Sequence, residues 1–115
     1  MNTIDTIKAQ IANNPVLLYM KGTPQFPMCG FSANVAQVLK TLKTKFSYVN
    51  VLENPDIRAE LPKYANWPTF PQLYVQGELI GGCDIVLELH ENNDLLPILE
   101  QANAILTDKT EFTAA

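Results

Sequence analysis

The apolar run at residues 16–20, Val-Leu-Leu-Tyr-Met, is the sequence feature that most constrains the fold. It follows Pro15 and does not alternate apolar with polar residues, so a strand built from it would be buried on both faces. Residues 46–51 alternate and predict a second strand, and apolar residues recur at helical spacing from about residue 31 to the lysines at 40–45. We predict a strand-helix-strand unit, right-handed if parallel, with residues 16–20 as the central strand.

Three further helices are predicted around this unit. Apolar residues at helical spacing within residues 4–11 predict a first helix, with Thr3 as its N-cap. Asn-Pro-Asp at residues 54–56 predicts a helix start, and Pro62 is compatible with a helix that is broken or restarted there. Leucines and isoleucines over residues 95–106 predict a closing amphipathic helix.

A hairpin is predicted over residues 73–80, with its turn at Gln76-Gly77-Glu78. Pro71 comes just before it and has no N–H to donate to a ladder, so we expect it at a strand entry or edge. Its peptide bond is a candidate for the cis form. The backbone of Phe70 would then stay unpaired and open to a ligand. Together these elements predict an α/β domain whose four-stranded mixed sheet is flanked by helices.

Composition and charge exclude several classes of function. The chain has 115 residues, 47% of them hydrophobic, and a net charge of −4, which argues against a general nucleic-acid binder. It has neither a basic leader followed by an apolar core nor an apolar run of about 20 residues, so we expect a cytoplasmic protein without a membrane partner. We expect one domain over residues 1–106 and a flexible tail over residues 107–115, which has little to bury.

Cys29-Gly30-Phe31-Ser32 places a cysteine directly before the helix that follows the central strand. Unpaired N–H groups and the dipole at a helix start favour thiolate over thiol, which makes Cys29 a candidate reactive thiol or metal ligand. The alternative is a small, buried apolar residue. Ser32 stands where a Cys-x-x-Cys motif has its second cysteine, so Cys29 acts without that partner.

Two other places in the sequence are candidates for ligand contacts. Gly81-Gly82-Cys83-Asp84 precedes a helix over residues 85–90, with Cys83 or Asp84 as its cap. Paired glycines at this position let backbone N–H groups converge on a carboxylate or phosphate, although alone they are a weak signal. Arg58 lies beside acidic neighbours, and local sequence favours a surface salt bridge for it.

These motifs, taken in order, closely resemble those of the monothiol glutaredoxins of the single-domain Cys-Gly-Phe-Ser type. The resemblance covers nearly the whole chain, and its motifs are specific together though weak singly. They are Lys21-Gly22, Cys29-Gly30-Phe31-Ser32, Trp67-Pro68-Thr69-Phe70-Pro71 and Gly81-Gly82-Cys83-Asp84. The resemblance implies a thioredoxin-like fold and a site for glutathione.

The resemblance also implies a role for each site residue. Lys21 would pair with a glutathione carboxylate and help to hold Cys29 as thiolate, and Arg58 would be a second basic contact in place of a salt bridge.

The resemblance implies that other segments of the chain contact the peptide and the γ-glutamyl end of glutathione. The resemblance implies that Thr69 and Phe70, before a cis Pro71, pair with the glutathione peptide as an added strand. Cys83 and Asp84 would cap the γ-glutamyl end, with Asp84 accepting from its α-amino group while helix N–H groups meet its carboxylate.

Two functions follow from the resemblance, a cluster carrier and an enzyme. A [2Fe–2S] cluster takes four ligands, and the resemblance supplies them as one Cys29 from each of two protomers and the thiols of two glutathiones. It implies a homodimer when the cluster is bound, transfer to apo iron–sulfur proteins and a BolA-like partner. The alternative is a glutathione-dependent thiol-disulfide oxidoreductase, for which we expect at most weak activity. We see no exposed apolar stripe to hold an obligate pair, so the apo protein is expected to be a monomer.

Overall fold

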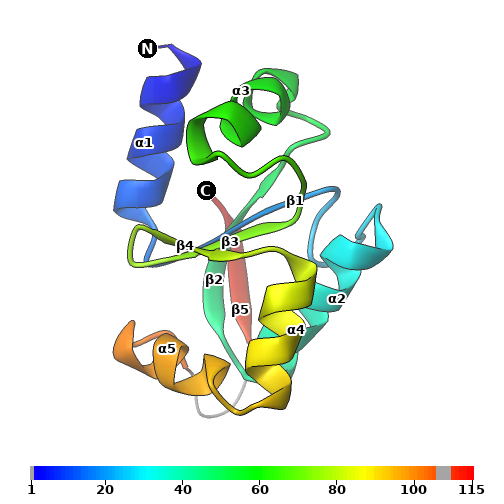
Figure 1. Ribbon diagram of the computed structural model, residues 1–115, viewed down its shortest axis with the longest axis vertical. Coiled ribbons are helices and arrows are strands. Elements are labelled where there is room, and N and C mark those ends of the chain that lie inside the picture. Colours follow the sequence, from blue (N-terminus) through cyan, green and yellow to red (C-terminus); the bar gives the residue numbers. More distant parts are fainter. Residues whose placement is uncertain (1, 106–109) are drawn as a thin grey trace.

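The structure is a computed structural model that describes residues 2–105 and 110–115. Its helices are α1 (Thr3–Asn13), α2 (Gly30–Thr41), α3 (Pro55–Ala65), α4 (Cys83–Glu91) and α5 (Leu95–Gln101). Its strands are β1 (Val16–Met20), β2 (Lys45–Asn50), β3 (Gln72–Val75), β4 (Glu78–Gly81) and β5 (Glu111–Ala114). The strands form one sheet in the order β4-β3-β1-β2-β5, with helices on both sides (Figure 1).

The central position of β1 confirms the prediction from its unbroken apolar run. All five of its residues are buried, and it pairs with β2 in parallel and with β3 in the antiparallel direction. Leu18 lies opposite Tyr48 on one side and Leu73 on the other. The predicted hairpin is also confirmed, since β3 and β4 pair antiparallel around Gln76 and Gly77, which both have positive φ as a two-residue hairpin turn requires.

The sheet separates two apolar cores, because successive side chains of β1 point to opposite faces. Leu18 and Met20 lie on the face covered by α2, α4 and α5. Leu17 and Tyr19 lie on the face where α1 and α3 pack together. The predicted α/β class, a mixed sheet flanked by helices, is therefore confirmed, and the carboxyl end of β1 is held rigidly between the two cores.

The predictions for helix ends need two corrections. The N-cap of α1 is Asn2 and not Thr3, since the Asn2 side chain accepts a hydrogen bond of 2.8 Å from the backbone N–H of Asp5. Helix α3 is not broken at Pro62 but continues to Ala65. A proline in a helix removes one hydrogen bond, to the residue four positions earlier. Here that residue is the exposed Arg58, whose carbonyl water can reach, while the rest of α3 is anchored in the core.

The closing helix is shorter than predicted. It ends at Gln101, and Ile105 forms an isolated bridge with Thr44 instead of a further helical turn. Asn103 has positive φ, which ends the helical path. Leu106, the last residue of the predicted helix, lies outside the described residues.

Strand β5 corrects the predicted count of four strands and the expectation that the tail has little to bury. Residues 111–114 pair in parallel with β2, so the sheet has five strands (Figure 1). Phe112 supplies the apolar contact that the tail was expected to lack, because its ring packs 5.7 Å from that of Phe46 and 6.3 Å from that of Tyr48, centroid to centroid. Residues 107–109 lie outside the described part of the chain.

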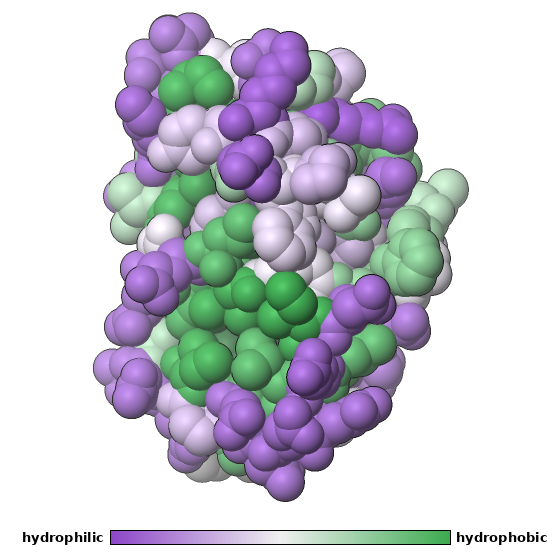
Figure 2. Space-filling model, viewed as in Figure 1, coloured by the Kyte–Doolittle hydropathy of each residue, from purple (hydrophilic) through white to green (hydrophobic). Residues whose placement is uncertain are grey.

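Apolar surface on one face of the molecule lies below β4, between α4 and α5, within a hydrophilic rim (Figure 2). Ile85 and Leu96 are the large exposed apolar residues of these two helices. None of the helices within the described ranges is long and apolar enough to cross a membrane.

Candidate functional site

The loop between β1 and α2 is a tight turn that brings the chain back to the end of β1. The backbone N–H of Met28 donates to the Lys21 carbonyl at 2.9 Å, and Gly22 bridges with Pro27. Gly22 has φ +94°, and a Cβ at this position would lie 2.5 Å from the carbonyl oxygen of Phe26. Only glycine combines a positive φ with the absence of a Cβ, which explains why Gly22 follows Lys21 at the end of the central strand.

Two side chains from other elements fix this loop. Asn50, at the end of β2, accepts through Oδ1 from the backbone N–H groups of Gly22 at 2.9 Å and Leu52 at 3.0 Å. Lys40 of α2 donates through Nζ to the Pro24 carbonyl at 2.5 Å. The loop is thus tied to the sheet and to the helix on either side of it, and the thiol that follows is held in place.

Cys29 is the N-cap residue of α2, as the sequence predicts, and its side chain is partly exposed. Its pKa is lowered, chiefly because the backbone N–H of Ser32 favours the thiolate, with further help from Phe31 and the positive charge of Lys21. Burial opposes the shift only in part. The partly exposed thiolate is a ready nucleophile or metal ligand.

Ser32 has a part in the site that the sequence did not indicate. It is fully buried, and its Oγ accepts a hydrogen bond of 3.1 Å from the backbone N–H of Lys21. Its side chain also helps to lower the pKa of the Cys29 thiol. The residue in the place of a second cysteine therefore joins the end of β1 to the thiolate.

The start of α4 differs from the prediction in its cap. Gly82 is the N-cap, and neither Cys83 nor Asp84 caps the helix, because both lie in its first turn. No side chain bonds to this helix end within the described residues, so its first N–H groups stay available. Cys83 is only 8% exposed, and burial raises its pKa.

The segment before β3 presents a backbone edge. The Phe70–Pro71 peptide bond is cis, as the sequence predicts, and β3 begins directly after it. Outside the regular elements, no backbone hydrogen bond of the described residues involves the N–H or the carbonyl of Phe70. This edge matches the site expected to accept a peptide as an added strand.

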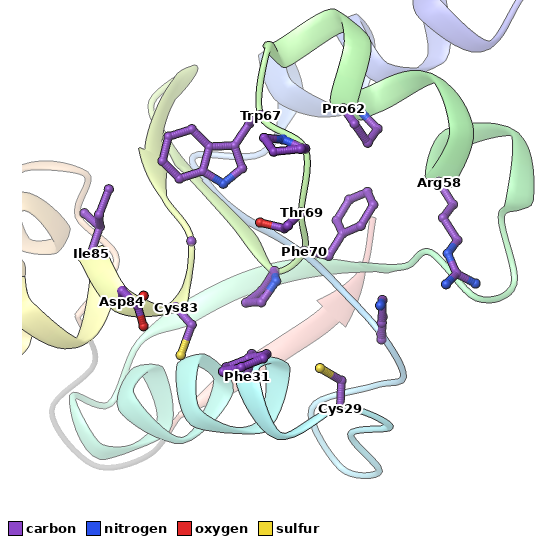
Figure 3. Close-up of a pocket in the computed structure, with 14 residues that line it drawn as sticks. Cys29, Phe31, Arg58, Pro62, Trp67, Thr69, Phe70, Cys83, Asp84 and Ile85 are labelled. Atoms are coloured by element: carbon purple, nitrogen blue, oxygen red, sulfur yellow. The ribbon is translucent and has the colours of Figure 1, made fainter.

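The structure brings every predicted site residue to one cleft of about 730 Å³. The predicted residues that line it are Lys21, Cys29, Arg58, Thr69, Phe70, Pro71, Cys83 and Asp84. Figure 3 shows Arg58 on α3 and Asp84 on α4 at opposite ends, with Cys29 facing the space between them. The cleft thus has a basic end, an acidic end beside open helix N–H groups, and a thiol between.

Arg58 lies at this cleft, and Asp56, one of its candidate salt-bridge partners, has another contact. The Asp56 carboxylate accepts a hydrogen bond of 3.0 Å from the hydroxyl of Thr3, at the start of α1. The placement of Arg58 agrees with the role that the resemblance implied for it.

Several lining residues were missed as site residues. They are Phe31, Pro62, Trp67, Pro68, Gly82 and Ile85. Four of them, Phe31, Trp67, Pro68 and Gly82, lie within the motifs that carried the resemblance, so their position beside predicted residues was the available signal. Pro62 and Ile85 come from helix surfaces and have no such signal.

Three exposed apolar residues, Phe26, Met28 and Phe31, lie close to Cys29 in the sequence, and we call them the apolar collar. These side chains are 75%, 70% and 61% exposed. In Figure 2 the loop that carries the first two projects from the right edge as a pale green knob. Three exposed side chains do not make the apolar stripe that an obligate pair would need, so the expected absence of such a stripe stays a prediction.

The described residues of one chain do not complete a metal site by themselves. The described residues contain no group of three or more His, Cys, Asp and Glu side chains placed to hold a metal ion. Cys29 is open to a metal, whereas Cys83 is buried with a raised pKa, so each protomer offers a single suitable thiolate.

Comparison with known proteins gives the family. The glutaredoxin family profile matches residues 16–80. The chain is 59% identical to Glutaredoxin 4 of Escherichia coli over 102 residues. This alignment covers 89% of each protein. The chain belongs to the glutaredoxin family. With Ser32 in its motif, this glutaredoxin is of the monothiol Cys-Gly-Phe-Ser type that the resemblance indicated.

Solved structures confirm the thioredoxin-like fold of this glutaredoxin. The solution structure of reduced poplar apo GrxS14 is 46% identical and superposes with a TM-score of 0.75, covering 87% of this chain and 92% of that one. A buckwheat glutaredoxin solved in complex with glutathione has a TM-score of 0.79 over 90% of this chain and 92% of its own. At 24% identity, the buckwheat likeness shows the fold alone.

Proposed function

We propose that this glutaredoxin binds glutathione in the cleft and, as a pair of protomers, carries a [2Fe–2S] cluster for iron–sulfur cluster storage, transfer and assembly. The observation that carries the proposal is a partly exposed Cys29 with a lowered pKa, at a cleft with oppositely charged ends. We place the protein in the cytoplasm, where a reducing environment keeps both cysteines as thiols.

Glutathione matches the cleft group by group. It is a tripeptide with a carboxylate at each end and an α-amino group beside one of them. One carboxylate would meet Lys21 and Arg58, and the γ-glutamyl end would meet the open N–H groups of α4 and the carboxylate of Asp84. Its peptide would pair with Thr69 and Phe70 as an added strand, which leaves its thiol beside Cys29.

The ligand count sets the assembly. A [2Fe–2S] cluster needs four ligands, and one protomer with one glutathione offers two thiolates. Two such protomers complete the set, so the cluster is the cargo that joins them. The collar would meet its counterpart there, but three side chains are far fewer than the 20–30 residues a side of a stable interface. Apo iron–sulfur proteins would receive the cluster, and a BolA-like protein would be a partner.

A second candidate function is favoured by the same thiolate. In a monothiol oxidoreductase, the Cys29 thiolate attacks the glutathione sulfur of a mixed disulfide, and the substrate leaves as a thiolate. A second glutathione thiolate then attacks the new Cys29 disulfide, which releases oxidised glutathione and restores the Cys29 thiolate. We rank this activity below cluster binding, because the loop before Cys29 and a glutathione posed to ligate iron need not suit a second glutathione attacking in line.

Anaerobic reconstitution with iron and sulfide, with and without glutathione, tests the main proposal. We expect visible absorption of a [2Fe–2S] cluster only when glutathione is present, because Cys29 alone cannot complete the ligand set. Equal colour without glutathione would contradict shared ligation. Rapid reduction of a small glutathione mixed disulfide, without any coloured species, would favour the oxidoreductase.

A further inference from the structure

Gln72 is a buried polar residue beside the proposed peptide-binding edge. It is the first residue of β3, directly after the cis Pro71, and its side chain is fully buried. A buried primary amide is costly unless its donors and its acceptor find partners. The contacts of this amide therefore indicate why a polar side chain occupies a core position.

The Gln72 amide makes three hydrogen bonds. Its Nε2 donates to the Trp67 carbonyl at 3.0 Å and to the Thr69 carbonyl at 3.2 Å. Its Oε1 accepts from the hydroxyl of Tyr74 at 2.9 Å. Both of its donors thus go to the segment between α3 and β3, and its acceptor is held from within its own strand.

These bonds act on a segment with few other ties. The loop hydrogen bonds of the described backbone include one at its start, from the Trp67 N–H to the Pro62 carbonyl, and none from Thr69 or Phe70. Gln72 occupies the carbonyls of Trp67 and Thr69 on the protein side, while Phe70 lines the cleft (Figure 3).

We propose that Gln72 is a positioning residue that fixes the backbone of Trp67 to Phe70 in the form that pairs with the glutathione peptide. Gln72 contacts the loop and not the ligand. Its effect is that the backbone of residues 67–70 is already ordered before glutathione binds, so binding loses less conformational entropy. The inference rests on the proposed function, since it names what prepares the peptide-pairing part of that site.

Titration of isotope-labelled protein with reduced glutathione, followed by NMR, tests this role at millimolar ligand concentrations. Gln72→Met keeps the length of the side chain but removes all three hydrogen bonds, and we expect it to raise the Kd about tenfold. Tyr74→Phe is the matched control, because it removes only the bond to Oε1 and leaves both bonds to the loop. We expect it to change the Kd by less than about threefold.

Gln72→Glu adds a readout that a merely structural role would not give. As a carboxylate it has no donor for the two carbonyls, but when protonated it regains one. Burial and the two carbonyl oxygens raise the pKa of such a carboxyl. We therefore expect its affinity, relative to the unchanged protein at the same pH, to recover several-fold as the pH falls from about 8 to 5.

The outcomes separate the inference from the proposed function. If the unchanged protein binds glutathione but Gln72→Met binds equally well, or Gln72→Glu shows no recovery at low pH, the positioning role is overturned and the proposed function stands. If the unchanged protein does not bind, the proposed function fails and takes the inference with it. Should Gln72→Met not fold, the pH dependence of Gln72→Glu decides alone.

Discussion

The two cysteines line the same cleft, and each lies at the start of a helix, yet their thiols have opposite properties. Cys29 is partly exposed, and hydrogen bonds from the start of α2 lower its pKa. Cys83 is buried in the first turn of α4, and its pKa is raised, first by burial and then by the charges of Asp84 and Cys29. A helix start therefore does not by itself make a reactive cysteine. Exposure and the groups that face the sulfur decide which thiol can act.

The largest effect should come from exchanging each sulfur for oxygen. Cys29→Ser should abolish cluster binding and leave the fold intact, because serine is small and caps a helix well. Cys83→Ser should lose much less, since this thiol is buried and is not a proposed ligand. Visible absorption after anaerobic reconstitution measures both. Equal loss in the two variants would make Cys83 a ligand and would refute the glutathione-shared cluster.

Reversal of the charge nearest the reactive thiol should come next. Lys21→Glu should weaken glutathione binding and raise the pKa of Cys29, because it replaces an attractive charge with a repulsive one for both anions. We expect at least a tenfold loss of glutathione affinity and most of the cluster colour. Lys63→Glu, on the exposed end of α3, is the matched control and should change neither. Retained colour in Lys21→Glu would contradict the role of that lysine.

The rates at which the two thiols react should differ in the same direction. Only thiolate reacts with iodoacetamide, so at pH 7 Cys29 should be alkylated more than about tenfold faster than Cys83. The pH at which the alkylation rate reaches half its maximum, the alkylation midpoint, should fall below the ordinary thiol pKa for Cys29 and above it for Cys83. Mass spectrometry of single-cysteine variants over a pH series gives both midpoints. A shared midpoint would remove the contrast between the sites.

Ser32→Ala sharpens this measurement. It removes the hydroxyl that accepts from Lys21 N–H and helps to lower the pKa of Cys29, so the pH midpoint for alkylation of Cys29 should move up while that of Cys83 stays. An unmoved Cys29 midpoint would assign the shift to the backbone N–H groups alone.

The smallest effect on the thiols should come from the far edge of the sheet. Phe112→Ala removes the ring of β5 that packs on Phe46 and Tyr48 and should lower the free energy of unfolding by about 1–2 kcal/mol. Both alkylation midpoints should stay as they were. Denaturant unfolding measures the loss, and a moved Cys29 midpoint would show that β5 is coupled to the site.

Local chemistry in the sequence was enough to predict the elements that build the site. The unbroken apolar run gave β1, the alternating run gave β2, and Pro71 gave a strand entry with a cis bond. The missed strand β5 depends on Phe112 meeting β2 far along the chain, and no local pattern records such a contact. Helix caps at Asn2 and Gly82 were missed by one or two residues, which is the ordinary uncertainty of helix ends.

The site itself was predicted in a different way. The resemblance placed its residues together, because no spacing along the chain shows that Arg58 and Asp84 face one cleft. The supporting contacts of Ser32 and Gln72 were not predicted, since each is made by a buried polar side chain whose partners no sequence pattern records. The side chains that line the cleft were therefore easier to predict than the contacts behind them.

Sedimentation of apo and cluster-loaded protein, with visible absorbance followed alongside mass, tests the central claim most directly. If the cluster takes one Cys29 per chain and two glutathione thiols, its loss removes the main contact between protomers. The account predicts a coloured dimer and a colourless monomer, and removal of glutathione should bleach and dissociate the dimer together. A coloured monomer, or a colourless dimer of equal tightness, would contradict it.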